Sequence, residues 1–346
     1  MTINTALIGF GLAGAHFHAP LITATPRLAL RNVVTSRADA VAAAYPDAVV
    51  AGNADVVFTD DSVELVVIAT PNHTHAELAR DALLAGKHVV IDKPFVVDAQ
   101  EGRDLAALAL ARGRMLTVFH NRRWDGDFVT VRRLLGSGRL GDVRLVEMRW
   151  DRHRPAIKQG WREVPGEGSG LLSDLGPHLV DQAIALFGTP DHVAGDVASQ
   201  RRDALVDDYF EVTLHYGAMR VILSSSSLVA ATRPRFAVHG TAGSFVKYGL
   251  DPQEGLLRAG GLPAGETYGE DVPEYYGIIV YPDGTQERIR TERGDWRLFY
   301  SGVAETIRGG FPPPVDPADA LVGMALLDCA RRSAREGRLL RYNPRC

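Results

Sequence analysis

The sequence predicts two domains of different class. The first is an α/β domain with a doubly wound parallel sheet, and the second is an α+β domain built on a mostly antiparallel open sheet. Up to about residue 120, short β-branched runs alternate with segments of helical periodicity, whereas beyond Trp124 apolar and polar residues alternate at a period of two. The length of 346 residues also suits two domains, which we expect at 1–121 and 122–346.

Six runs in the first half have the length and composition of buried parallel strands. Between two of them, Leu78, Ala79, Ala82 and Leu83 recur at helical spacing, so this segment can lay one apolar face on the sheet. The six predicted strands are residues 5–8, 28–35, 48–50, 65–69, 88–91 and 115–119.

The second half shows its strand period most clearly over residues 209–216, where Phe210, Val212 and Leu214 alternate with polar side chains. Further predicted strands are 143–150, 220–225, 236–239 and 244–248. The Gly- and Pro-rich stretch 255–269 is expected to be a surface loop. An apolar helical stripe from Leu321 to Cys329 predicts a C-terminal helix that buries Cys329 and packs back toward the first domain.

Composition limits the classes of partner. The chain has 42 acidic and 38 basic side chains, a net charge of −4, so it lacks the positive excess that nucleic acid or an anionic membrane attracts. Cys329 and Cys346 are too few for a disulfide framework or a zinc cluster. No apolar run approaches the roughly 18 residues that a membrane helix needs. We therefore expect a cytoplasmic protein.

A glycine-rich loop follows the first predicted strand. Gly9, Gly11 and Gly14 have the spacing G-x-G-x-x-G and enclose Leu12 and Ala13 at the start of a helix. Glycines allow a tight turn and a close approach of the backbone to a pyrophosphate, and the helix N-terminus offers unpaired N–H groups. We interpret the loop as the dinucleotide site of a Rossmann domain; the alternative is a glycine-rich packing turn.

The end of the second strand indicates the coenzyme. An NAD site normally has Asp or Glu there, but this chain has Thr35, Ser36 and Arg37. A partly exposed contact between arginine and phosphate contributes about 1.5–3 kcal/mol, enough for roughly a tenfold to hundredfold preference. We expect NADP(H) to be preferred without excluding NAD(H). The alternative is that Arg37 is a solvated residue at a helix start.

The carboxyl ends of parallel strands lie along one edge of a sheet, so the segments that follow them can converge on a ligand. Lys93 is the most informative residue there, because a lysine at the inner end of a parallel strand is harder to explain as solvated surface. A structural ion pair is the alternative. The residues predicted at this edge are Thr70, Pro71, Asn72, His73, Asp92, Lys93, Pro94, His120, Asn121 and Arg122.

In the second half, Asp174, His178 and Asp181 follow a glycine-rich segment. Pro177 is tolerated at a first helical position, so we expect a helix to begin near Gly176. If the helical path extends further back, Asp174 and His178 lie at i and i+4 on one face. A carboxylate beside an imidazole can fix its tautomer, although such a pair also serves in capping and packing.

Taken in order, these motifs resemble those of the Gfo/Idh/MocA oxidoreductases over essentially the whole chain. The resemblance rests on the loop from Gly9 to Gly14, on Asp92-Lys93-Pro94 and on the motif D-x-x-x-H-x-x-D at 174–181. The stretches 17–21, 35–37, 120–125 and 161–163 are further similar to the NADP-dependent scyllo-inositol dehydrogenase branch. Two departures are Asp92, where the family usually has Glu, and Ser169, which interrupts its usual glycine run.

The resemblance implies hydride transfer between nicotinamide and a ring hydroxyl or ketone of a polyol or sugar, with Lys93, Asp174 and His178 at the reacting centre. We expect His178 to act as general base, Asp174 to orient it and Lys93 to hydrogen-bond the reacting oxygen, although Lys93 and His178 could exchange these roles. The resemblance also places His75 around the cofactor. Expected substrate contacts are Lys93, Arg122, His153, Arg154, Trp161, Arg162, Asp174 and His178.

Several alternatives stay open. A cyclic polyol such as scyllo-inositol is the first choice of substrate, and an aldose or glycoside is the second. Proteins of other classes are a dinucleotide-binding regulatory protein, a glycosidase that retains its nicotinamide, and a metal enzyme using His-x-His pairs. We expect no metal, because neither pair has a clear third ligand. Relatives often pair through the second sheet, so a homo-oligomer, dimer or tetramer, is expected.

Overall fold

The computed structural model describes residues 2–166 and 168–343. Contacts divide the chain into two compact units, and each is described by itself. The first comprises Met1–Trp124, Pro252–Tyr268 and Asp295–Leu321, and the second comprises Asp125–Asp251, Gly269–Gly294 and Val322–Cys346. These units differ from the predicted single cut after residue 121, because two later segments belong to the first unit.

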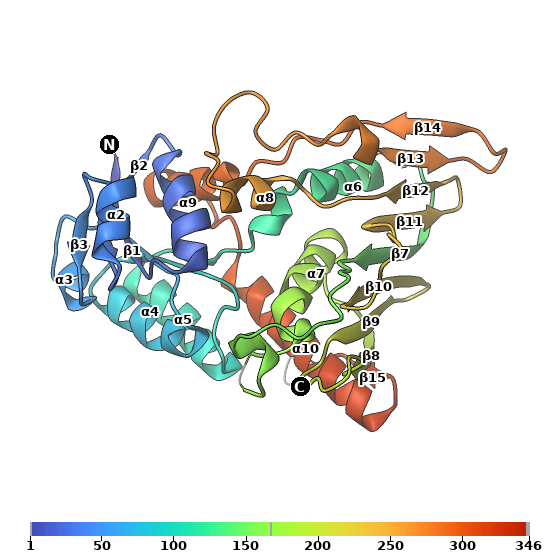
Figure 1. Cartoon of the computed structure of the whole chain (residues 1–346), viewed down its shortest axis with the longest axis horizontal. Helices are drawn as coiled ribbons and strands as arrows, with labels where there is room; N and C mark the ends of the chain where they lie inside the picture. Colours follow the sequence, from blue (N-terminus) through green and yellow to red (C-terminus); the bar gives the residue numbers. More distant parts are fainter. Residues whose placement is uncertain (1, 167, 344–346) are drawn as a thin grey trace. The chain divides into compact units, whose positions relative to one another are not determined.

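The first unit contains a six-stranded sheet in the order β3-β2-β1-β4-β5-β6 (Figure 1). All five pairings are parallel. Every residue of β4 is buried, as expected for a strand covered on both faces. The doubly wound α/β class and all six predicted strands are therefore confirmed. The strands are β1 (Ile3–Ile8), β2 (Leu28–Val34), β3 (Val49–Ala51), β4 (Leu65–Ile68), β5 (His88–Ile91) and β6 (Leu116–Val118).

Helices pack around this sheet, and two helices of the first unit, α8 and α9, come from late in the chain. Helix α4 packs against α5, and α1 packs against α9, whose Phe299, Tyr300 and Val303 join the apolar core. The helices and short helical turns are η1 (Gly14–His18), α1 (Ala19–Thr23), α2 (Ala38–Ala44), α3 (Asp55–Phe58), η2 (Asn72–Thr74), α4 (His75–Leu84), α5 (Ala99–Arg112), η3 (Asn121–Trp124), α8 (Gln253–Arg258) and α9 (Arg297–Gly309).

The prediction of a surface loop over 255–269 is wrong in part. Helix α8 covers its first residues, and Leu257 and Tyr268 are only 1% and 3% exposed. Burial of these apolar side chains in the first unit stabilises the segment, and its glycine and proline content gives no sign of this.

The second unit contains a nine-stranded sheet in the order β14-β13-β12-β11-β7-β10-β9-β8-β15. All its pairings are antiparallel except that of β7 with β10, which confirms the mostly antiparallel class. The strands are β7 (Val143–Arg149), β8 (His192–Ala198), β9 (Tyr209–Tyr216), β10 (Met219–Ser226), β11 (Phe236–Gly240), β12 (Ser244–Lys247), β13 (Gly277–Val280), β14 (Gln286–Ile289) and β15 (Leu340–Arg341).

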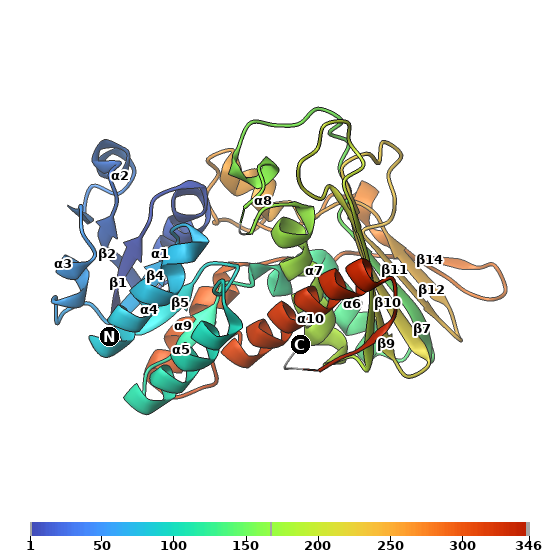
Figure 2. The ribbon, with the colours of Figure 1, turned by 90° about the horizontal axis from the view of Figure 1, so that it is seen from below.

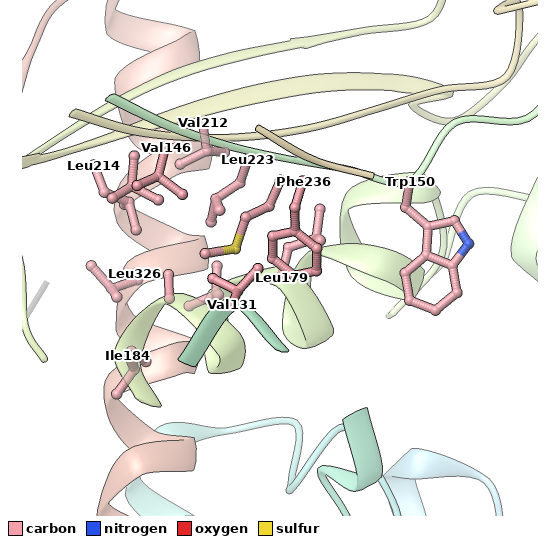
Figure 3. Close-up of a cluster of buried hydrophobic side chains, with 14 of the residues drawn as sticks. Val131, Val146, Trp150, Leu179, Ile184, Val212, Leu214, Leu223, Phe236 and Leu326 are labelled. Atoms are coloured by element: carbon pink, nitrogen blue, oxygen red, sulfur yellow. The ribbon is translucent and has the colours of Figure 1, made fainter. Parts of the chain in front are cut away.

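One face of this sheet is covered by α6 (Gly126–Gly136), α7 (Leu171–Phe187) and most of α10 (Pro317–Glu336), which lie on the same side of it (Figure 2). Val146, Val212 and Leu223 from the strands pack with Val131 and Leu179 from the helices (Figure 3). Cys329 is fully buried in the same core, as predicted. Short helical turns are η4 (Trp161–Glu163) and η5 (Pro273–Tyr275). Among the described residues, no helix is long and apolar enough to cross a membrane.

Candidate active site

The glycine loop after β1 is built so that side chains would not fit. Gly9 has a φ of 100°, and a Cβ there would lie 2.4 Å from the carbonyl oxygen of Ala69. A Cβ at Gly14 would lie 2.1 Å from the carbonyl oxygen of Gly9, whereas one at Gly11 would meet nothing within 4 Å. Two glycines thus serve the turn and its packing, and Gly11 leaves open space beside the backbone. This cradle fits the pyrophosphate of a dinucleotide.

The end of β2 joins this loop, because the Gly9 N–H donates to the Val34 carbonyl at 2.9 Å. Thr35 follows directly, and its hydroxyl oxygen accepts from the Arg37 N–H at 3.0 Å. The side chains of Ser36 and Arg37 are exposed. The segment that carries these hydroxyls and the exposed Arg37 therefore begins beside the glycine loop, and it offers no carboxylate at 35–37.

The outlets of β4 and β5 are tied together by His75. This ring is fully buried, with Nε2 3.0 Å from the Thr70 carbonyl and Nδ1 3.0 and 3.2 Å from the carbonyls of Pro94 and Phe95. Carbonyl oxygens only accept hydrogen bonds, so both ring nitrogens face acceptors of the protein. These contacts favour a structural role for His75 over the cofactor contact implied by the resemblance.

The other predicted residues after β4 remain accessible to different degrees. Thr70 and Thr74 share a hydroxyl–hydroxyl contact of 2.7 Å, and the Thr74 hydroxyl donates to the Pro71 carbonyl. Asn72 is half-buried, and His73 is exposed. This loop therefore presents polar groups while its backbone is held in place.

Asp92 and Lys93 follow β5, and the Lys93–Pro94 peptide bond is cis. The Asp92 carboxylate accepts from the Lys93 N–H at 2.9 Å and lies 3.5 Å from Nε2 of His18. Burial alone would raise the pKa of Asp92, but the His18 contact and the charges of Lys93 and His75 outweigh it and lower that pKa. Asp92 is therefore a stabilised anion beside a half-buried lysine.

The segment after β6 is largely buried. His120, Asn121 and Arg122 are each 5% exposed. The Arg122 guanidinium pairs with Glu254 of α8 and lies 4.7 Å from the centroid of the Trp296 ring. These contacts favour a role for Arg122 in holding the first unit together over the predicted substrate contact.

In the second unit, α7 begins at Leu171, so the predicted start near Gly176 is wrong and Pro177 lies inside the helix. The cause is a cap supplied from elsewhere: Asp207 accepts from the Leu172 N–H at 2.7 Å with its carboxylate and from the Leu171 N–H with its carbonyl. Burial raises the pKa of Asp207, against the effect of this hydrogen bond. The helical path places Asp174 and His178 at i and i+4.

Asp174 and His178 have distinct surroundings. The Asp174 carboxylate lies 3.4 Å from Arg162 Nε and 3.9 Å from Arg152 Nη1. His178 is 7% exposed, and its ring centroid lies 5.7 Å from that of Trp150 at an interplanar angle of 31°. Arg152 and Trp150 were not predicted, since nothing in their local sequence distinguishes them from strand and loop residues. Asp181 is buried.

The loop between β7 and α7 carries the remaining predicted residues. Arg201, with a side chain 3% exposed, pairs with Glu163 at 2.6 Å and with Asp208 at 2.8 Å, so it fastens this loop to the strands. His153, Arg154 and Arg162 are exposed. The side chain of Trp161, like Cys346, lies outside the described part of the chain.

The two clusters belong to different units, Lys93 to the first and Asp174 with His178 to the second. Within residues 2–166 and 168–343, no group of three or more His, Cys, Asp or Glu could hold a metal ion.

Comparisons with known proteins match the chain to two family models, one for each end of the sequence. Residues 3–120 match a family model described as "Oxidoreductase family, NAD-binding Rossmann fold", and residues 132–342 match its "C-terminal alpha/beta domain". The chain is 38% identical to scyllo-inositol 2-dehydrogenase (NADP(+)) IolW of Bacillus subtilis, covering 98% of this chain and 96% of that protein. It is 43% identical to the oxidoreductase YdgJ of Escherichia coli, covering 96% of each. The structure of the oxidoreductase YvaA of Bacillus subtilis superposes with a TM-score of 0.96 at 38% identity and 99% coverage of both chains.

Proposed function

This chain belongs to the Gfo/Idh/MocA family of NAD(P)-dependent oxidoreductases, and from that premise we propose that it transfers hydride between NADP(H) and a ring hydroxyl or ketone of a cyclic polyol. An inositol of the scyllo type is the first substrate to test. The observation that carries this choice is the 38% identity, over almost the full length of both chains, to a protein named scyllo-inositol 2-dehydrogenase (NADP(+)).

The proposed coenzyme site uses the first unit. Gly9, Gly11 and Gly14 receive the pyrophosphate, and the exposed Arg37 with Ser36 and Thr35 receives the 2′-phosphate. Asn72, His73, Asp92 and Asn121 extend the coenzyme contacts along the same edge of the sheet. When bound, nicotinamide supplies the carbon that accepts or donates hydride.

The proposed proton chemistry uses residues of both motifs. As hydride leaves the carbinol carbon, the hydroxyl proton passes to His178, and the C–O bond becomes a carbonyl. Asp174 orients His178, and the Asp174 carboxylate is itself paired with Arg152 and Arg162. Lys93 hydrogen-bonds the reacting oxygen and stabilises the negative charge that develops there. In the reverse direction His178 returns the proton to the ketone.

A substrate panel tests this function. Purified protein is assayed for absorbance change at the NADPH band with scyllo-inositol, myo-inositol, glucose and methyl glucosides, each with NADP and with NAD. We expect the highest kcat/KM with an inositol and NADP. Turnover confined to glucose or glucosides would replace the polyol with an aldose or glycoside, and inactivity on all of them would remove the proposal.

A further inference from the structure

A buried tyrosine and histidine stand behind the outlet of β5. The hydroxyl oxygen of Tyr300, on α9, lies 2.6 Å from Nδ1 of His18, on η1, and both residues are 0% exposed. The His18 ring packs against Phe119 with centroids 4.3 Å apart. Its other nitrogen, Nε2, lies 3.5 Å from Oδ1 of Asp92. Tyr300, His18 and Asp92, from three segments far apart in the sequence, therefore form one line of polar side chains inside the first unit.

The direction of hydrogen bonding along this line follows from the donors available. Burial and the charge of Asp92 raise the pKa of Tyr300 well above its ordinary value, so the phenol keeps its proton. Nδ1 of His18 is the one hydrogen-bond acceptor that this hydroxyl meets among the described residues. A ring that accepts at Nδ1 carries its proton at Nε2, and that N–H faces a carboxylate, which only accepts. The donors thus run from Tyr300 through His18 to Asp92.

The carboxylate at the end of this line is held from several sides. Its Oδ1 accepts from the Lys93 N–H at 2.9 Å. The charged or titratable groups that interact with the carboxylate are His18, Lys93 and His75, together with the Tyr300 phenol. The separation of 3.5 Å from His18 Nε2 exceeds an ordinary hydrogen bond, so this link is mainly electrostatic. His18 Nε2 has no shorter partner among the described residues. Its proton therefore acts chiefly on Asp92.

We propose that Tyr300 and His18 are positioning residues that hold Asp92 as an oriented anion beside Lys93. The Asp92 anion in turn orients Lys93 toward the reacting oxygen during hydride transfer. This inference rests on the proposed function, in which Lys93 contacts the reacting oxygen. Tyr300 and His18 touch neither coenzyme nor substrate in this scheme, and they act through Asp92.

The first test needs no turnover. In protein labelled with ¹⁵N-histidine, with His18 assigned by a His18→Gln variant, the nitrogen shifts should place the ring proton on Nε2 and show Nδ1 as the hydrogen-bond acceptor. In Tyr300→Phe the Nδ1 resonance should move because its donor is lost. A ring protonated at Nδ1, or an Nδ1 resonance that Tyr300→Phe leaves in place, would overturn the donor direction and with it the proposal.

The second test is a double-mutant cycle between Tyr300→Phe and Asp92→Asn. Tyr300→Phe should lower kcat about tenfold, the effect of losing one positioned hydrogen bond, while the Kd for NADPH changes less than about threefold. The acidic limb of the pH profile of kcat should move to higher pH, because Asp92 loses support for its anion. In the Asp92→Asn background, Tyr300→Phe should change kcat less than about twofold.

Tyr281→Phe is the matched control, since it removes a hydroxyl that contacts Arg139 and Glu287 in the second unit and should leave kcat unchanged. Equal losses from Tyr300→Phe in both backgrounds, or an unmoved acidic limb, would reject the proposal. A wild-type protein inactive on the whole panel would reject the proposed function, and the histidine spectra would still decide the donor chain.

Discussion

Arg122 and Lys93 follow neighbouring strands, and their different surroundings favour different roles. Arg122, after β6, is buried with its guanidinium on Glu254 and over Trp296. Lys93, after β5, is half-buried beside the Asp92 carboxylate. Because an arginine engaged in this way has fewer donors left for a ligand, Lys93 is the stronger candidate for contact with the reacting oxygen.

Arg37 carries the predicted coenzyme preference. Replacing it with alanine removes the one exposed cation of the 35–37 segment, so the ratio of kcat/KM for NADP to that for NAD should fall roughly tenfold to hundredfold. Arg80→Ala, at an exposed position of α4, is the control and should keep the ratio. Steady-state kinetics with both coenzymes measures it, and a ratio unchanged in Arg37→Ala would reject phosphate recognition by this side chain.

His178 carries the predicted proton transfer. In His178→Ala, turnover should fall by roughly 10² to 10⁴, the usual contribution of a positioned general acid or base, while NADPH binding followed by fluorescence stays intact. The pH profiles of kcat for His178→Ala and Lys93→Met distinguish the two roles. The variant that lacks the proton-transfer group should lose the pH-dependent limb of its profile. Full turnover by His178→Ala would contradict the assignment.

His88 makes the first unit sensitive to acid. Its Nδ1 accepts from the Met115 N–H at 2.9 Å, and burial, followed by the charge of Arg114, lowers its pKa to about 4. The unfolded chain binds this proton near pH 6.5, so the stabilisation is complete above that pH and is lost as the pH falls toward 4. The loss is up to about 3 kcal/mol.

Urea unfolding at pH 7 and pH 5 measures this effect. His88→Asn retains an acceptor but does not titrate, so the difference in unfolding free energy between the two pH values should shrink in that variant. An equal difference in both proteins would assign the acid sensitivity to other groups.

At the scale of elements, the sequence predicts those strands and helices whose stability depends mainly on their own residues. All six strands of the first sheet were predicted, because continuous β-branched runs are typical of buried parallel strands. Strands β8, β13, β14 and β15 were not predicted, since their short or mixed runs depend on partners for stability. The start of α7 was mispredicted because its cap, Asp207, lies 35 positions further along the chain.

The candidate site divides in the same way. The glycine loop, Lys93 and the pair of Asp174 and His178 carry motif spacings, so the sequence alone indicates them. Tyr300 and Arg201 have no such signal, because they matter only through contacts with residues far away in the chain. Arg122 and His75 have structural contacts where the sequence predicts ligand contacts, because both are buried and residue type alone does not reveal burial.

The loop between β7 and α7 depends on one such distant residue. Arg201→Met should release Glu163 and leave Asp208 without its buried partner, so the loop that carries Arg162 becomes mobile. We expect KM for the polyol to rise about tenfold or more, with the Kd for NADPH within about twofold, because the coenzyme loop lies in the other unit.

Arg201→Lys is the conservative comparison and should recover part of the polyol KM, since it keeps one charge but not the fork of donors. Kinetics with varied polyol and a separate coenzyme titration give the two constants. A rise in the coenzyme Kd as large as that in KM would indicate general unfolding in place of a loosened loop.

At the scale of the whole molecule, the nine-stranded sheet has one face without a helical cover among the described residues (Figure 1). Val146, Leu223, Phe245 and Ile279 point to the core, so their strand neighbours point to the opposite face. That face carries the half-buried Ile222 and Val246, the latter paired in register with Ile278, which is 39% exposed. In that row the register puts Ala237 and Glu147 between Val246 and Ile222, so its contiguous apolar part is Ala237, Val246 and Ile278. Apolar side chains grouped on an uncovered face are typical of a protein interface.

We therefore expect this face to join copies of the chain as a dimer or tetramer. Sedimentation velocity should give a mass that is a multiple of 37.5 kDa, and Val246→Lys combined with Ile278→Lys should shift it toward one chain, because charges placed in an apolar interface lose their hydration. Leu110→Lys, at a position 84% exposed on α5, is the control and should leave the mass unchanged. A wild-type mass of one chain, or an assembly that survives both lysines, would show that this face is not the interface.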